Sequence, residues 1–351
     1  MNSVIAQQKV VVDGLKKRSS YPHKVLKVKL EETHISWIFL TELYVYKVKK
    51  ELKFGDVLDF STLQLRRKFC QKEVVLNKIL CDDMYKGVVK IVSKDDNEYQ
   101  YNNNKSKNNL RIVNLEYKPK AFEYAVKMKQ IPQQYRMDNL LKRHKISLRT
   151  IKRLSETLVK FHALTPTNTK IKNYGQPKFI KSKVKENFGT LSNLAKKIDP
   201  KFEKKLISFI RNNKKLFYHR ISEDKVRDIH GDLYLKNIFV VQNKFYLYDR
   251  IEFNDSLRYA DVVEDVAHLS MDLDHNKRIN LRRYFVSQYI EKSNDVNLEE
   301  LIYFWMCYKA CVRAKVSLFH AKNEPAADKR ESYVEESNNL LVLADCYLEF
   351  L

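Results

Sequence analysis

The most informative stretch of the sequence is IHGDLYLKNI at residues 229–238, with YD following at residues 248–249. Asp232 and Asn237 lie five residues apart in a loop before a short apolar run, and Asp249 ends the next run, 17 residues after Asp232. Two adjacent strands would bring these loops together. Phosphoryl transfer needs a carboxylate that accepts the proton of a hydroxyl group, and hard oxygen ligands that hold Mg²⁺ on the phosphates. The spacing of the three side chains therefore favours phosphotransferase chemistry.

Acidic residues are concentrated around this stretch of an otherwise basic chain. The sequence has 66 Lys and Arg against 43 Asp and Glu, a formal net charge of +23. Between residues 222 and 274, however, acidic residues outnumber basic ones two to one. On composition alone a solvated acidic surface is the simpler explanation, but the His-Gly-Asp spacing favours a place where a divalent cation would bind.

Outward from this stretch, the first third of the chain has the pattern of a β-rich unit. Period-two apolar patterns predict six strands, and helical spacing predicts one helix at residues 63–80. The polar tract at residues 95–109 indicates a hairpin loop. Ile131-Pro132 breaks the pattern, as a linker would. The predicted strands cover residues 25–30, 35–40, 43–49, 87–92, 110–117 and 123–128.

Beyond the linker, most apolar residues recur at helical spacing, and two short strands at residues 238–241 and 245–248 interrupt them. We therefore expect an α+β fold with a basic N-terminal segment (1–23), a small β-rich N-lobe (24–131) and a large helical C-lobe (132–351). The predicted helices of the C-lobe cover residues 137–144, 148–164, 184–198, 202–216, 279–290, 298–319 and 332–350.

The motif around Asp232 resembles that of the aminoglycoside phosphotransferase and choline kinase-like family. HGDLYLKN followed by YD carries the resemblance, and the shorter matches are similar to one bacterial and archaeal branch of the family. The resemblance spans about residues 30–275 and implies the bilobal protein-kinase-like fold. The shorter matches are ETHISW at 32–37, YKVK at 46–49, FST at 60–62, YAVKM at 124–128 and IEFN at 251–254.

The resemblance also implies roles for the residues of the motif. Asp232 would be the catalytic base, Asn237 and Asp249 would hold magnesium on ATP, and His230 would organise the loop. The branch is often fused to a C-terminal P-loop domain, and no GxxxxGK[ST] occurs in this sequence. Position 234 is Tyr, where the family often has His, which bears on how the charge of the γ-phosphate is stabilised.

Lys47 is the candidate phosphate-binding lysine of the N-lobe. It lies on the third predicted strand, where kinase-type folds place a lysine against the α- and β-phosphates. Lys49 shares its strand face, so the assignment could shift by two residues. Glu73, in the middle of the following helix, is the natural ion-pair partner.

The turn that would cover the phosphates contains Thr33, His34 and Ser36. The sequence has no GxGxxG motif, so backbone and hydroxyl donors would have to do this work. Outside the motif, we expect His162 to pack rather than react. We expect Asp261 and Asp265 to support the site rather than to bind metal.

Cysteine content and hydropathy argue against several classes of protein. Five cysteines without paired CxxC spacing argue against a disulfide framework and against a zinc site. No run of about 18 apolar residues occurs, so we expect no membrane span, and the N-terminus lacks a secretory signal. We expect a cytoplasmic protein.

The sequence thus predicts a small-molecule kinase that transfers the γ-phosphoryl group of ATP to a hydroxyl group, with ATP and Mg²⁺ as cofactors. The acceptor and the oligomeric state stay open. A basic segment at residues 170–220 would suit an anionic acceptor, although a solvated face explains it more simply. One alternative is a pseudokinase-type nucleotide-binding module, which Tyr234 favours. A basic nucleic-acid-binding protein is the other, but no such motif is visible.

Overall fold

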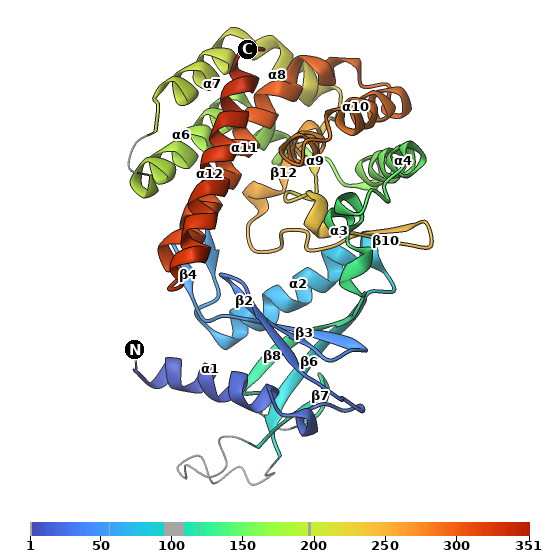
Figure 1. Cartoon of the computed structure of the whole chain (residues 1–351), viewed down its shortest axis with the longest axis vertical. Coiled ribbons are helices and arrows are strands. Elements are labelled where there is room, and N and C mark those ends of the chain that lie inside the picture. Colours follow the sequence, from blue (N-terminus) through green and yellow to red (C-terminus); the bar gives the residue numbers. More distant parts are fainter. Residues whose placement is uncertain (1, 56, 95–108, 119, 196–197) are drawn as a thin grey trace. The chain divides into compact units, whose positions relative to one another are not determined.

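The computed structural model describes residues 2–55, 57–94, 109–118, 120–195 and 198–351. The chain divides into two compact units (Figure 1). Unit 1 comprises Met1–Gln133 and Tyr246–Asn254, and unit 2 comprises Gln134–Phe245 and Asp255–Leu351. This division differs from the predicted lobes because the N-terminal segment and residues 246–254 both belong to unit 1.

Unit 1 is built on one six-stranded sheet in the order β1-β2-β3-β8-β6-β7, with every neighbouring pair antiparallel. The prediction of a strand at residues 25–30 is wrong in position, because the pairing with β2 begins only at Lys29. Most of the polar tract predicted as a hairpin loop lies outside the described residues. The strands are β1 (Lys29–Glu32), β2 (Ser36–Leu40), β3 (Tyr44–Lys49), β6 (Tyr85–Ser93), β7 (Leu110–Asn114) and β8 (Glu123–Lys129).

Two helices cover this sheet. Helix α1 (Asn2–Leu15) contributes to a core with alternate residues of β3, Tyr46 and Val48. Helix α2 (Leu63–Cys81) packs against β6 and β8, and Figure 1 shows it on the side of the sheet away from α1. Because successive side chains of a strand point to opposite faces, the residues of β3 between these core positions face α2.

Unit 2 is mainly helical and is organised around α11. Helix α11 packs against α6, α9 and α12, and α10 packs against α4 and α9. Figure 1 shows α11 and α12 running side by side. The helices of eight or more residues are α4 (Leu148–Leu164), α6 (Pro177–Leu194), α7 (Lys201–Asn212), α8 (Lys214–Ser222), α9 (Val263–His275), α10 (Ile279–Ser293), α11 (Glu299–Asn323) and α12 (Ala327–Leu348), and the shorter ones are α3 (Met137–Lys142) and α5 (Thr169–Lys172).

Short strands complete the two units. In unit 2, β9 (Val226–Asp228) pairs with β12 (Tyr259–Asp261). The segment at residues 230–237 leads into β10 (Ile238–Val241), and the chain returns to unit 1 within β11 (Lys244–Leu247). In unit 1, β4 (Lys53–Phe54) pairs with β5 (Leu58–Asp59).

Membrane-spanning helices and the state of the cysteines can both be examined in the described residues. Within the described residues, no helix combines the length and apolarity that crossing a bilayer requires. All five cysteines have free thiols, and four of them are buried while Cys346 is exposed.

Candidate active site

The two candidate lysines of β3 both reach the same glutamate on α2. Nζ of Lys47 lies 3.0 Å from Oε1 of Glu73, and Nζ of Lys49 lies 2.6 Å from Oε2. The predicted Lys47–Glu73 ion pair is therefore present. Lys49 is fully buried, pairs also with Glu252, and stacks 4.9 Å over the ring of Phe60. The structure thus places Lys49 in a closed internal network.

Lys47 has a different second partner. Its Nζ lies 2.5 Å from Oδ1 of Asp249, the predicted metal ligand, whose side chain is 41% exposed. Burial alone would lower the pKa of Lys47, but Asp249 and Glu73 outweigh burial and raise that pKa well above its ordinary value. Lys47 is therefore charged and lies beside the exposed carboxylate, which distinguishes it from Lys49.

The segment that carries Asp249 is fixed to α2 and β6 by hydrogen bonds. The backbone N–H of Asp249 donates to the Tyr85 hydroxyl at 3.2 Å, and that of Arg250 donates to Oδ1 of Asn77 at 2.8 Å. Asp249 has φ of 64°, in the left-handed region that non-glycine residues rarely adopt. Such backbone strain persists where surrounding contacts impose it, and it is frequent at functional sites.

The predicted phosphate-covering turn connects β1 and β2 and is closed by its own hydrogen bonds. The Thr33 hydroxyl accepts from the N–H of Ser36 at 2.9 Å and donates to its carbonyl at 3.2 Å. The Ser36 hydroxyl is buried and has no hydrogen-bond partner within the described part of the chain. Burial is the main cause that lowers the pKa of His34. The Thr33 hydroxyl is therefore used in shaping the turn.

The predicted catalytic motif forms a loop in unit 2 that brings Asp232 and Asn237 together. The Asn237 side-chain nitrogen donates to the Asp232 backbone carbonyl at 3.0 Å and to Oδ2 at 3.2 Å. His230 is fully buried, and its Nδ1 accepts the N–H of Asp232 at 3.3 Å. Gly231 has φ of 88°, a conformation that favours glycine. The loop presents Asp232 with 40% of its side chain exposed.

Two buried carboxylates of helix α9 accept hydrogen bonds from the backbone of this loop. Asp265 accepts the backbone N–H groups of His230 at 2.7 Å and Gly231 at 2.9 Å. Asp272 accepts the N–H of Leu235 at 2.8 Å. Burial would raise the pKa of Asp265, but hydrogen bonds and the neighbouring His162 lower it below its ordinary value. An ionised Asp265 therefore fixes the backbone on which Asp232 is mounted.

The other two predicted supporting residues are also buried and paired. His162 is bonded on one side to Asp265 at 3.1 Å and on the other to the Tyr289 hydroxyl at 2.7 Å. Asp261 forms two hydrogen bonds with the buried guanidinium of Arg220, at 2.5 and 2.7 Å. Neither Asp261 nor His162 is placed to bind a ligand, and sequence reasoning did not identify Arg220 or Tyr289 as their partners.

The donor set of the predicted metal ligands suits magnesium. Asn237 and Asp249 offer amide and carboxylate oxygens, which are the hard ligands that Mg²⁺ prefers. The Asn237 nitrogen is engaged by Asp232, so the amide oxygen is the atom that would bind a cation. In the described ranges, no group of three or more His, Cys, Asp or Glu side chains is arranged to hold a metal ion. A cation beside either residue would therefore depend on further ligands, such as those that a nucleotide and water supply, which is usual for Mg²⁺.

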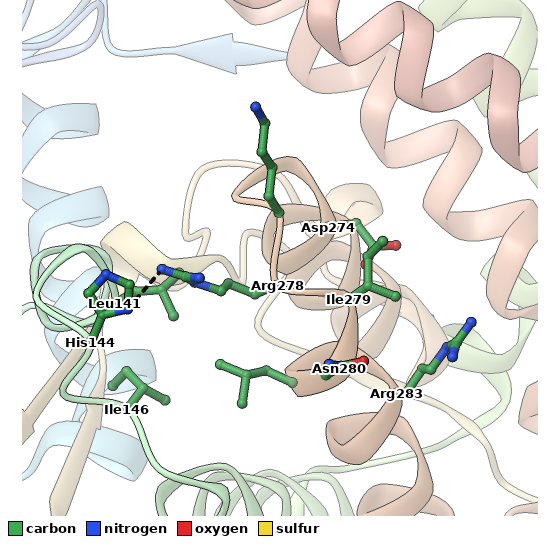
Figure 2. A pocket seen from close by; sticks show the side chains of 10 residues that line it. Leu141, His144, Ile146, Asp274, Arg278, Ile279, Asn280 and Arg283 are labelled. Carbon is green, nitrogen blue, oxygen red and sulfur yellow. Dashed lines mark hydrogen bonds between the residues drawn. The ribbon is translucent and has the colours of Figure 1, made fainter.

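A separate hollow of about 810 Å³ opens on unit 2 beside α3, α9 and α10 (Figure 2). Arg278 and His144 approach each other there, with 3.4 Å between Nη2 and Nδ1, as the dashed line in Figure 2 shows. None of the predicted site residues lines it. The lining residues are Leu141, His144, Ile146, Asp274, Lys277, Arg278, Ile279, Asn280, Leu281 and Arg283.

Comparison with known sequences finds distant relatives. No protein-family profile matches the chain. One uncharacterised protein of Mycobacterium bovis and two of Mycobacterium tuberculosis are each 28% identical over 309 residues, which is 86% of this chain. The match covers 57% of each relative, so the chain spans just over half of their length.

Comparison with solved structures identifies the fold. A choline kinase from Cryptosporidium parvum aligns over 97% of this chain and 95% of its own, with 9% identity and a TM-score of 0.53. A choline/ethanolamine kinase family protein from Mesorhizobium loti covers 97% and 98%, with 10% identity and a TM-score of 0.51. A variant of aminoglycoside 2'-phosphotransferase-IIIa in complex with GDP covers 93% of both chains, with 13% identity and a TM-score of 0.52. The bilobal kinase-like α+β fold predicted from the sequence is confirmed.

Proposed function

We propose that this chain, whose fold is that of the choline kinases and aminoglycoside phosphotransferases, transfers the γ-phosphoryl group of ATP to a hydroxyl group of a small molecule. The observation that carries the proposal is the geometry of the catalytic loop. Asn237 holds Asp232 by two hydrogen bonds, and the Asp232 carboxylate remains partly exposed. A carboxylate fixed in this way can accept a proton without first reorganising.

In the proposed reaction, Asp232 accepts the proton of the acceptor hydroxyl. The hydroxyl oxygen forms a bond to the γ-phosphorus while the bond from that phosphorus to the β,γ-bridging oxygen breaks. ADP leaves with the electron pair of the broken bond, and Asp232 then releases its proton to solvent. Asp265 contributes by holding the backbone of residues 230 and 231, so that Asp232 keeps its orientation.

The remaining predicted site residues bind and orient the nucleotide in this proposal. Lys47, held by Glu73, donates to the phosphates and balances their charge. Asn237 and Asp249 would hold magnesium, which when bound neutralises charge on the phosphate oxygens. Lys49 stays with Glu252 and Glu73 and supports the position of Glu73.

The proposal is tested by measuring ATP and GTP consumption against a library of hydroxylated metabolites, with wild type and Asp232→Asn in parallel. Asn keeps the shape of the side chain and removes the proton acceptor. We expect Asp232→Asn to lower turnover by about 10²–10⁴-fold and to leave nucleotide affinity little changed. Asp328→Asn, an exposed aspartate at the start of α12, is the matched control and should retain wild-type turnover.

Two results would contradict the proposal in different ways. Full turnover by Asp232→Asn on a genuine substrate would remove Asp232 as the base. Nucleotide binding by the wild type without turnover of any acceptor would favour a pseudokinase-type module, the alternative that Tyr234 suggested from the sequence.

A further inference from the structure

Three side chains from different elements are stacked beside Asp232. The ring of Tyr234 lies against the ring of His268 on α9, with centroids 5.6 Å apart and planes inclined by 13°. The guanidinium carbon of Arg313 on α11 lies 4.3 Å from the centroid of the same Tyr234 ring. Stacking and cation–π contacts of this kind restrict the rotamers of all three side chains. The stack is therefore a fixed feature of unit 2 next to the proposed base.

The stack contains buried hydrogen-bonding groups that this part of the chain leaves unused. His268 is 2% exposed, and neither of its ring nitrogens has a hydrogen-bond partner among the described residues. Nη1 of Arg313 is also buried and has no partner there, while Nη2 makes only a long contact of 3.5 Å with Glu336. Buried donors and acceptors in folded proteins are almost always paired. Two such groups in one stack leave hydrogen-bonding atoms available to a ligand beside Asp232.

The Asp232 carboxylate does not supply the partner of His268. Nδ1 of His268 lies 3.8 Å from Oδ1 of Asp232, which is beyond hydrogen-bonding distance. Burial, together with Lys309 and Arg313, lowers the pKa of His268 well below its ordinary value. A neutral imidazole has one N–H to donate and one nitrogen that accepts.

The charges around the stack favour an anionic ligand over a cationic one. Arg313 is permanently charged and its side chain is 14% exposed, so its charge is poorly screened by water. Lys309, one turn earlier on α11, has its Nζ 3.4 Å from the carbonyl of Gly231, directly before Asp232. Glu264 pairs with Lys309 at 3.1 Å, whereas the ion pair of Arg313 with Glu336 is long, at 3.5 Å. Asp272 and Asp232 also lie near enough to raise the pKa of Arg313. A guanidinium with a free edge binds carboxylate and phosphate groups better than neutral oxygens.

We infer that the acceptor of the proposed reaction carries an oxyanion, a carboxylate or a phosphate, which Arg313 binds through Nη1 while His268 donates a second hydrogen bond to the acceptor. The inference rests on the proposed function, since it concerns the molecule whose hydroxyl group faces Asp232. It separates the acceptor of this chain from cations such as choline, which Arg313 would repel. Arg313 and His268 are then specificity-determining residues, and Tyr234 positions both of them.

Turnover with matched acceptors tests this inference. The matched acceptors all carry a hydroxyl group and differ in charge: glycerol is neutral, glycerate and glycerol 3-phosphate are anionic, and choline is cationic. The same comparison of charge extends to the metabolite library. We expect every compound that is turned over to carry a carboxylate or a phosphate. Arg313→Gln should raise the acceptor KM by about 10- to 100-fold, the range for loss of a charged hydrogen bond, and should leave the nucleotide KM unchanged. Arg313→Lys should recover part of the loss, and Arg149→Gln, an exposed arginine on α4, should behave as wild type.

A binding measurement separates this inference from the proposed function. Inorganic phosphate should raise the melting temperature of wild type more than that of Arg313→Gln, with chloride at equal ionic strength as the reference. A neutral or cationic best acceptor, or an Arg313→Gln effect on the nucleotide KM instead of the acceptor KM, would overturn the inference. Equal phosphate shifts in the two proteins would also overturn it. If no acceptor is turned over but the phosphate shift depends on Arg313, the anion site stands and the kinase activity fails.

Discussion

Nζ of Lys47 lies 2.5 Å from Oδ1 of Asp249, although 202 residues separate them in the sequence. The contact joins the predicted phosphate-binding lysine to the predicted metal ligand within unit 1. Lys47 has Glu73 as a second partner, so its ammonium group lies between two carboxylates. In the proposed function, a phosphate group would take the place of Asp249 beside Lys47, and a cation would take the place of Lys47 beside Asp249.

Asp249→Ala should abolish most of the stabilisation that ATP gives in the presence of Mg²⁺. A ligand that binds only the folded state raises the melting temperature by mass action, so loss of binding appears as loss of the shift. The measurement is thermal unfolding with ATP and Mg²⁺, compared with ATP and EDTA. Asp13→Ala, at a partly exposed aspartate on α1 that pairs with Lys16, is the control and should keep the full shift. An equal shift in wild type and Asp249→Ala would remove Asp249 from the site.

The two lysines of β3 should respond to substitution in different ways. Lys47→Ala should weaken ATP binding, because it removes the ammonium group that we propose to contact the phosphates. That group lies beside the partly exposed carboxylate of Asp249. Lys49→Met should mainly destabilise the fold, by about 3–5 kcal/mol, because it leaves Glu252 buried without its cation and leaves Glu73 with Lys47 alone. Calorimetric titration with ATP and urea denaturation measure the two effects. The reverse order, with ATP affinity lost only in Lys49→Met, would show that Lys49 contacts the phosphates.

Regular elements with one buried face were predicted well from the sequence. The helix at residues 148–164 and the strand at residues 238–241 have the predicted bounds. Helix α9 was missed because residues Val263–Leu273 are all buried, so it has no polar face to set against an apolar one. Its acids occupy interior positions, which an amphipathic pattern does not anticipate.

The excess of acidic residues between residues 222 and 274 predicts a place where a cation binds. In the structure, many of these acids are internal partners instead: Asp261 binds Arg220, Glu264 binds Lys183, and Asp265 binds the catalytic loop. Composition shows that charges are close in sequence, but burial decides whether they face a ligand or another residue.

Asp232 and Asn237 lie in one loop, as the sequence predicts, because they are only five residues apart. The supporting contacts of this loop could not be located in this way. Leu235 and Asp272 are 37 residues apart, and Lys49 and Glu252 are 203 apart. Arg313 and His268 lie on helices with no motif of their own, so only the folded chain places them against Tyr234.

The free energy of unfolding should fall as the pH decreases from 7 to 5, and His268 should contribute to this slope. Its folded-state pKa lies well below the ordinary value of 6.5, because of burial and of neighbouring cations. Below pH 6.5 the unfolded chain therefore binds a proton that the folded chain does not, and acid favours unfolding. The slope from one such group approaches about 1.4 kcal/mol per pH unit. Urea denaturation at several pH values should give a shallower slope for His268→Gln in this window and parallel curves above it. Identical slopes would mean that His268 takes up a proton in the folded state.

Asp265→Asn should lower kcat while leaving the affinity for ATP nearly unchanged. In the wild type, the two carboxylate oxygens of Asp265 accept hydrogen bonds from the N–H groups of His230 and Gly231. The substitution replaces one of these oxygens by an NH₂ group, so that two hydrogen-bond donors face each other. The backbone that carries Asp232 must then move, at a cost of about 1–3 kcal/mol in stability for the unsatisfied buried group. Lys47 and Asp249 belong to unit 1 and do not depend on this contact.

Asp274→Asn is the matched control, because Asp274 lies on the same helix and its hydrogen bonds, to Arg282 and Tyr347, are remote from the loop. Steady-state kinetics should show a fall in kcat for Asp265→Asn alone. A similar fall in both variants would mean that the effect arises from general loss of stability and that Asp265 has no particular role in orienting the base.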